Sequence, residues 1–150
     1  MTQLTSKTLY DSDFALWIEE TISKLKAQEF ERVDWENLIE EVESLGKRDK
    51  RELKSRLITL FEHLLKRIYV PLPDCYRGWE VTIRRTQSKL KDILADSPSL
   101  SGFLASIYFD CYQEAVDNMQ IEYDAYFPDL CPFPQDVTVL LTEKLWEKSQ

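Results

Sequence analysis

The sequence contains few of the residues on which many cofactor and metal sites depend. Its 150 residues include three glycines and one histidine. Neither a G-x-G-x-x-G nor a G-x-x-x-x-G-K-[ST] pattern occurs, which argues against a glycine-rich loop that binds phosphate. A single histidine excludes metal sites built from three histidines. It also argues against a di-iron carboxylate bundle, because such a bundle needs the E-x-x-H motif twice. No cofactor is expected.

Cysteine is scarce as well. The three cysteines, Cys75, Cys111 and Cys131, are widely spaced, and no C-x-x-C motif occurs. We interpret them as reduced thiols of a cytoplasmic protein, because disulfides are rare in that compartment. Cys111 is predicted to lie on an apolar helix face, where a buried thiol is inert. Cys131, in a proline-rich segment, is predicted to be the most exposed of the three.

Long hydrophobic runs are absent. No apolar stretch approaches the roughly 20 residues that a membrane helix needs. The N-terminal segment MTQLTSKTLYDSDF lacks the basic start and apolar core of a signal peptide. With 43% hydrophobic and 12% aromatic residues, the chain is nevertheless expected to fold. We predict a single domain over residues 1–150, without a membrane partner.

Charge is distributed unevenly along the chain, whose net charge is −8. Residues 1–46 carry 4 basic and 11 acidic side chains, residues 47–91 carry 13 and 5, and residues 92–150 carry 2 and 11. Basic helices packed among acidic ones would explain this pattern, and so would a basic surface that meets nucleic acid or an acidic partner. The first explanation is favoured, because an acidic chain repels phosphate at long range.

Residues 34–71 are expected to form the centre of the fold. Asp34 is a suitable N-cap for a helix, and Gly46 follows the last residue of its apolar stripe. Asp49 and Glu52 then resemble the start of a second helix, which ends before Pro71. We predict an antiparallel hairpin of two helices joined at Gly46. The first helix of this hairpin has an apolar stripe of Trp35, Leu38, Ile39, Val42 and Leu45.

Further helices are predicted around this hairpin from apolar residues at helical spacing. The predicted ranges are 11–27, 79–95, 98–123 and, as a short final helix, 135–144. The segment YFPDLCPFP (126–134) contains three prolines and is expected to be extended, with its aromatic side chains docked on the bundle. The sequence thus predicts an all-α, single-domain bundle of five to six helices.

Several motifs resemble one known family. The run DWENLIEEVESLG is followed by RELKSRL and LLKR, and YDSDFALW, WEVTIRR, SPSL and a late proline–cysteine motif occur elsewhere. Together they resemble the family filed as domain of unknown function twenty-nine, small proteins known mainly from cyanobacterial genomes. The resemblance covers about residues 10–135, and the C-terminal tail (about 136–150) departs from the family's ending. It implies an all-helical fold and brings no known activity or catalytic residue.

An acidic cluster is the first candidate site. Carboxylates on bundle helices can bind metals, as in a magnesium-dependent helical hydrolase. At about 100° per residue, however, three of the four carboxylates lie on one flank of their helix and the fourth on the other. An acidic surface that pairs with basic side chains is the favoured interpretation. The cluster consists of Glu36, Glu40, Glu41 and Glu43.

The remaining candidates are a histidine and several arginines. His63 is predicted at the rim of the core beside Arg56 and Arg67, and no motif supplies a catalytic partner for it. Arg84 and Arg85, together with lysines of the central region, would form a basic surface for nucleic acid.

We therefore expect a small cytoplasmic interaction or regulatory module rather than an enzyme. It would bind a protein partner through a charged helix face or the proline-rich segment. A metal-carboxylate hydrolase and a nucleic-acid-binding protein remain alternatives, and self-association stays open.

Overall fold

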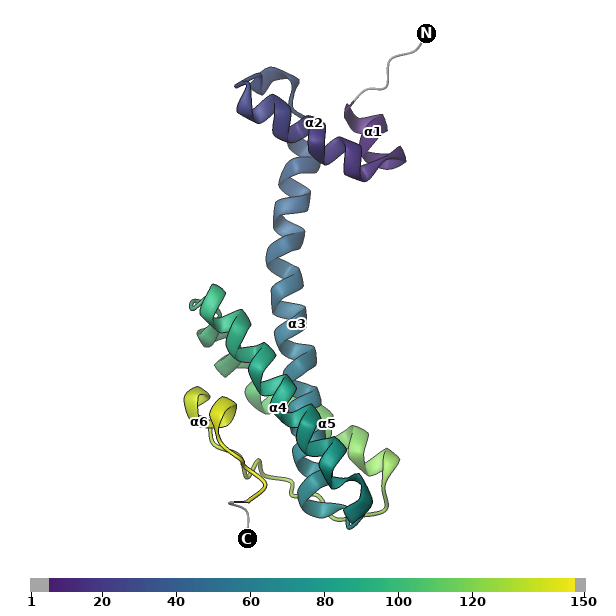
Figure 1. Ribbon diagram of the computed structural model, residues 1–150, viewed down its shortest axis with the longest axis vertical. Helices are drawn as coiled ribbons and strands as arrows, with labels where there is room; N and C mark the ends of the chain where they lie inside the picture. Colours follow the sequence, from purple (N-terminus) through teal and green to yellow (C-terminus); the bar gives the residue numbers. More distant parts are fainter. Residues whose placement is uncertain (1–5, 148–150) are drawn as a thin grey trace. The chain divides into compact units, whose positions relative to one another are not determined.

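The computed structural model describes residues 6–147, and the side chains of residues 9–147. All regular structure within this range is helical, which confirms the all-α prediction (Figure 1). By their contacts, the residues divide into two compact units, unit 1 (Met1–Lys47) and unit 2 (Arg48–Gln150), which are described separately. The single-domain organisation stays a prediction. The elements are α1 (Ser6–Ser12), α2 (Phe14–Lys26), the 3-10 helix η1 (Phe30–Arg32), α3 (Trp35–Tyr69), α4 (Pro73–Asp96), α5 (Leu100–Glu122) and α6 (Val137–Thr142).

Helix α3 runs without a break through Gly46, so the predicted hairpin is wrong. Gly46 is helical, and no glycine of the chain has a positive φ. The helical spacing continues across Gly46, since Leu45, Asp49 and Leu53 follow one another at a spacing of four residues along one face. A glycine in a helix interior costs only about 1 kcal/mol relative to alanine, which the rest of a long helix can offset. Asp34 does cap the helix as predicted, because its carboxylate accepts a hydrogen bond from the backbone N–H of Asn37 at 3.4 Å.

Unit 1 has a small core around Trp17 of α2. The Trp17 ring lies 4.9 Å from the Tyr10 ring, centroid to centroid, and 5.8 Å from the Phe14 ring. The Tyr10 hydroxyl donates a hydrogen bond to Glu41 of α3, which raises the pKa of Tyr10 to about 12. This bond links α1 to the first part of α3 within the unit. Of the apolar side chains in unit 1, Leu9, Trp17 and Val33 are buried.

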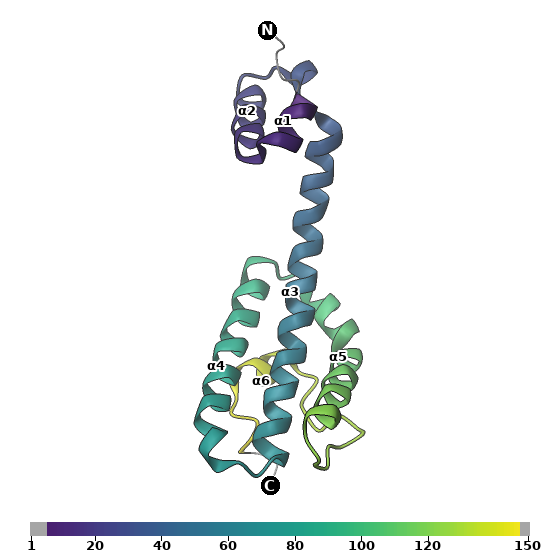
Figure 2. The ribbon, with the colours of Figure 1, turned by 90° about the vertical axis from the view of Figure 1, so that its right-hand side faces the viewer.

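Unit 2 is built around the second part of α3, with α4 and α5 on either side of it (Figure 2). Its core is one continuous cluster centred on Phe61, which is fully buried. The Phe61 ring stacks on Phe133 at 5.7 Å and meets Tyr108 and Tyr112 edge to face at 5.2 and 5.6 Å. Aromatic edge-to-face pairs of this kind add to the stabilisation that burial provides.

The proline-rich segment 126–134 contains no helix and docks on unit 2 through two of its three aromatic side chains, whereas Tyr126, which was predicted to dock as well, is exposed. Phe127 and Phe133 are buried. The Tyr108 hydroxyl donates to the carbonyls of Phe133 and Pro134 at 2.7 and 2.9 Å, and the Tyr112 hydroxyl donates to Pro128 at 2.6 Å. Two tyrosines of α5 thus satisfy carbonyls of a segment that has few backbone donors of its own.

Some element boundaries differ from those predicted. The predicted helix 11–27 corresponds to α2, which begins at Phe14 because Asp13 caps it through a hydrogen bond from the Leu16 backbone amide. A separate helix that was not predicted, α1, ends at Ser12. Helix α4 starts at Pro73 rather than near Trp79, since proline suits the first position of a helix. Residues 148–150 of the predicted tail lie outside the described range. Within that range, no helix is both long and apolar enough to cross a membrane.

Candidate functional site

The four glutamates of the predicted acidic site do not converge. Glu36, Glu40 and Glu43 are exposed on α3, and Glu41 is half-buried beside Tyr10. Among residues 9–147, no group of three or more His, Cys, Asp or Glu side chains is placed to hold a metal ion. A magnesium-dependent hydrolase would need at least three of these carboxylates in one cleft, and the described geometry does not supply that.

His63 is half-buried on α3, at the edge of the unit 2 core as predicted. Its Nδ1 lies 2.9 Å from the Thr59 carbonyl oxygen one turn earlier, so the Nδ1–H group donates to the backbone. Burial lowers the pKa of His63 below its usual value of 6.5, against the opposing effect of this hydrogen bond. The contact made by Nδ1 is thus structural and does not form a catalytic pair.

Two of the four candidate arginines form ion pairs. Arg56 Nε lies 2.9 Å from Glu52 Oε1 within α3. Arg67 Nε lies 2.7 Å from Glu80 Oε2 of α4, and its guanidinium carbon lies 4.0 Å from the centre of the Tyr76 ring. Arg67 therefore holds the end of α3 against the start of α4. Arg84 and Arg85 are exposed on α4.

The cysteines differ from the prediction in one respect. Cys111 is buried, and burial raises its pKa to about 11, as expected of an inert thiol. Cys131 was predicted to be the most exposed, but it is half-buried, and its Sγ donates to the Tyr108 hydroxyl at 3.2 Å. Cys75 is the exposed cysteine. The docking of the proline-rich segment accounts for the covering of Cys131.

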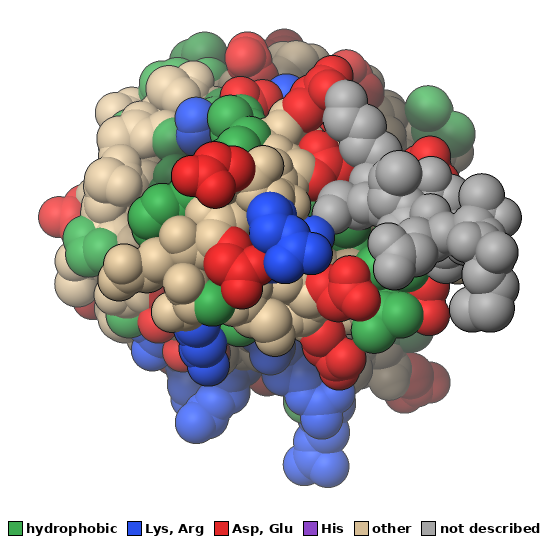
Figure 3. Space-filling view, turned by 90° about the horizontal axis from the view of Figure 1, so that it is seen from above, with side chains coloured by type: hydrophobic (Ala, Val, Ile, Leu, Met, Phe, Trp, Pro, Cys, Tyr) green, Lys and Arg blue, Asp and Glu red, His purple; other side chains and the backbone are tan. Residues whose placement is uncertain are grey.

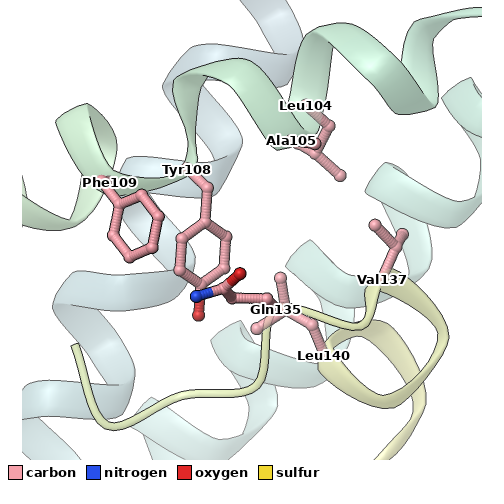
Figure 4. Close-up of a pocket in the computed structure, with 7 residues that line it drawn as sticks. All are labelled: Leu104, Ala105, Tyr108, Phe109, Gln135, Val137 and Leu140. Carbon is pink, nitrogen blue, oxygen red and sulfur yellow. The ribbon is translucent and has the colours of Figure 1, made fainter.

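A small apolar cavity lies between α5 and the segment that leads into α6 (Figure 4). Its volume is about 70 Å³. This volume is well below the roughly 300–1,000 Å³ typical of small-molecule sites, so the cavity is too small for a metabolite. It is lined by Leu104, Ala105, Tyr108, Phe109, Gln135, Val137 and Leu140.

The most unusual surface is an exposed apolar row on the first part of α3. Its four members lie at positions i, i+4, i+7 and i+10, so they share one face of the helix. Between 44% and 59% of each side chain is exposed. Soluble proteins rarely leave contiguous apolar patches of this kind without an interaction that uses them. We call this row the α3 stripe; it consists of Trp35, Ile39, Val42 and Leu45.

Carboxylates flank the α3 stripe. Glu36, Glu40 and Glu43 are exposed along one side of it. The view from above in Figure 3 shows acidic and hydrophobic side chains interspersed on one face, together with a few basic ones. Helix α2 adds four large exposed apolar side chains, and three of them follow one another at a spacing of four residues: Phe14, Ile18 and Ile22, with Leu16 as the fourth. The surface of unit 1 therefore combines apolar rows with negative charge.

Sequence reasoning placed the α3 stripe at the centre of the fold and so missed this surface. The spacing of Trp35 and Ile39 gives the apolar face of the helix, and it does not say whether another element covers that face. No local signal in the sequence distinguishes a covered helix face from an uncovered one.

A family model described as domain of unknown function DUF29 matches residues 9–146. No curated protein and no solved structure matches the chain.

Proposed function

The chain belongs to the family of the domain of unknown function DUF29, and we propose that it is a cytoplasmic protein-interaction module. Unit 1 binds a basic amphipathic helix of a partner protein along the α3 stripe. The observation that supports this function is the exposure of four large apolar side chains in one row, beside three exposed carboxylates.

The spacing of the stripe suits a helical partner. At about 100° per residue, apolar side chains at i, i+4, i+7 and i+10 lie within one third of the helix circumference. A second helix can place its own apolar face against such a row. Taking a half-exposed side chain of this size out of water is worth on the order of 1 kcal/mol. Four such side chains, with Trp35 as the large aromatic anchor, can provide the apolar part of a specific interface.

Charge selects the partner. Residues 1–46 carry 11 acidic and 4 basic side chains. A partner helix with lysine or arginine beside its apolar face would meet Glu36, Glu40 and Glu43 with the opposite sign. A symmetric pairing of two copies through this patch would instead bring like charges together, because the same surface meets itself. The charge pattern therefore favours another, basic protein over a second copy.

Two designed peptides test the proposal. Both are amphipathic helices with the same leucine face; one has lysine and the other glutamate on its polar face. Isothermal titration calorimetry with the full chain should show binding of the lysine peptide only. Replacing Ile39 and Val42 with serine should abolish this binding while leaving the helical content unchanged, since both side chains are more than half exposed.

A matched control uses exposed apolar side chains of unit 2. Ile121 and Leu130 are 87% and 85% exposed, and changing both to serine should leave the affinity for the lysine peptide unchanged. Equal binding of the two peptides would reduce the stripe to a non-specific apolar surface and refute the proposal. Self-association of the chain that depends on Ile39 and Val42 would replace the proposed partner with a second copy.

A further inference from the structure

Unit 2 contains a hollow that the proposed function does not use. It lies between α4 and the segment from Leu141 to Trp146, in the region where α6 lies beside α4 (Figures 1 and 2). Its volume is about 340 Å³, which falls within the range of roughly 300–1,000 Å³ typical of small-molecule sites. The residues that line it are Arg84, Gln87, Ser88, Lys91, Leu141, Thr142, Glu143, Lys144 and Trp146.

One wall of the hollow is a row on α4. Arg84, Ser88 and Lys91 are at positions i, i+4 and i+7, so their side chains lie on one face of the helix. All three are exposed. This face offers a guanidinium group, a hydroxyl and an ammonium group to a ligand.

The opposite wall comes from the end of α6 and the residues that follow it. Lys144 supplies a third cation, and the indole of Trp146 lies half-buried against the core. Buried Gln87 of α4 fixes this wall, because its Nε2 donates to the carbonyls of Leu140 and Glu143 at 2.9 and 3.0 Å. The two walls are thus joined by the protein itself, and the site exists before a ligand arrives.

The hollow has a surplus of positive charge in an acidic chain. Arg84, Lys91 and Lys144 line it together with one carboxylate, Glu143. Over residues 9–147, none of the three cations forms an ion pair; the pairs in this range involve Arg32, Arg56 and Arg67. Cations gathered without carboxylate partners raise the local positive potential, which an anionic ligand would neutralise.

From this geometry we infer that the hollow binds a mononucleotide. Its phosphate lies among Arg84, Lys91 and Lys144, and its base stacks on Trp146. Guanidinium and ammonium groups are the usual partners of phosphate, and an indole face stacks on any base. The hydroxyls of Ser88 and Thr142 lie in the same hollow to bind the sugar and phosphate oxygens.

The inference is tested by isothermal titration calorimetry of the full chain with three ligands. AMP should bind, adenosine should not, and ribose 5-phosphate should bind more weakly than AMP because it has no base to stack. Changing Arg84 and Lys91 to glutamine should weaken AMP binding at least about tenfold. Trp146→Leu should remove the advantage of AMP over ribose 5-phosphate.

The matched control is the pair Arg85→Gln and Lys89→Gln, exposed cations of α4 that do not line the hollow. This variant should bind AMP like the unchanged chain. An equal loss in both double variants would mean general charge attraction and would overturn the inference, as would an absence of AMP binding. Preference for single-stranded RNA over AMP, with dependence on Arg85 and Lys89, would also overturn it and indicate an extended nucleic-acid surface.

Discussion

The two units of the chain use their apolar residues in opposite ways. Unit 2 buries 21 hydrophobic side chains in one cluster, whereas three in unit 1 are buried, counting the described residues. Of the 15 large hydrophobic side chains exposed in that range, nine lie in unit 1, although it is the shorter unit. Unit 2 therefore has a core that can stabilise it, and unit 1 presents to solvent the apolar surface that a partner would cover.

Buried polar groups show the same contrast. In unit 2, buried Gln87 and the Tyr108 and Tyr112 hydroxyls donate to backbone carbonyls. In unit 1, the buried Trp17 Nε1 has no hydrogen-bond partner in the described structure. An unsatisfied buried donor costs about 1–3 kcal/mol, so it lowers the stability of a unit that already has a small core. Unit 1 thus has more to gain from a partner than unit 2.

The largest expected effect is the loss of the Phe61 side chain. Phe61→Ala removes a fully buried ring that contacts Phe133, Tyr108 and Tyr112. It should lower the free energy of unfolding by about 3–5 kcal/mol, the usual range for phenylalanine truncation in a core. Urea unfolding followed by circular dichroism measures it. Ile39→Ser in unit 1 is the comparison and should change stability by no more than about 0.5 kcal/mol. Equal losses in the two variants would show that the α3 stripe is covered in solution.

The second prediction concerns the anchoring of the proline-rich segment. Tyr108→Phe removes the hydroxyl that donates to the carbonyls of Phe133 and Pro134. Leaving buried acceptors unpaired should cost about 1–3 kcal/mol and should speed proteolytic cleavage within residues 126–134. Tyr126, which is 73% exposed, provides the control, because Tyr126→Phe should change neither quantity. Unchanged cleavage in Tyr108→Phe would mean that side-chain burial alone holds the segment.

The third prediction tests the continuity of α3 at the boundary between the units. Gly46 is helical, and a Cβ atom built there would meet no atom within 4 Å. Gly46→Ala should therefore stabilise the helix by up to about 1 kcal/mol, seen as higher helicity and a higher midpoint of thermal unfolding. Gly78→Ala in α4 has equally open surroundings and should act in the same direction. If Gly46→Ala were destabilising, a left-handed turn at this residue would be indicated.

Gly46 also shows where sequence reasoning about the fold stops. Local signals correctly identified the Asp34 cap, the absence of a helix in the proline-rich segment and the helical fold class. A glycine followed by Asp49 and Glu52 is equally compatible with a turn and with an exposed helix interior. Tertiary packing decides between the turn and the helix here. The core of unit 2 begins at Leu53, and the helix that contains Leu53 continues back through Gly46 to Trp35.

The candidate sites were harder to predict for a related reason. Periodicity correctly gave the apolar faces of α2 and α3, but which faces stay uncovered depends on the tertiary arrangement. The basic hollow depends on the same kind of information. Gln87 and Leu140 are separated by 53 positions in the sequence, and their hydrogen bond brings Trp146 and Lys144 to α4. No local spacing encodes such a contact.

The smallest expected effect is the pH dependence that His63 gives to unit 2. Burial lowers its pKa in the folded chain, so below about pH 6.5 the unfolded chain takes up the proton first. The contribution of His63 to the free energy of unfolding should therefore be fully present above that pH, and it should be lost as the pH drops towards the folded-state pKa. The neighbouring Glu62 and Glu122 reduce this effect and Lys66 increases it.

Urea unfolding of the unchanged chain and of His63→Gln at several pH values measures this contribution. All other titratable groups are the same in both proteins, so the comparison isolates His63. The free energy of unfolding of the unchanged chain minus that of His63→Gln should fall as the pH falls. A difference that grows as the pH falls would mean that the folded chain favours the charged imidazole. The two units should differ here as well. The chain has one histidine, and it lies in unit 2. Binding of the lysine peptide to unit 1 should therefore be the same at about pH 7.5 and about pH 6, since histidine is the side chain that ordinarily changes its charge in this interval.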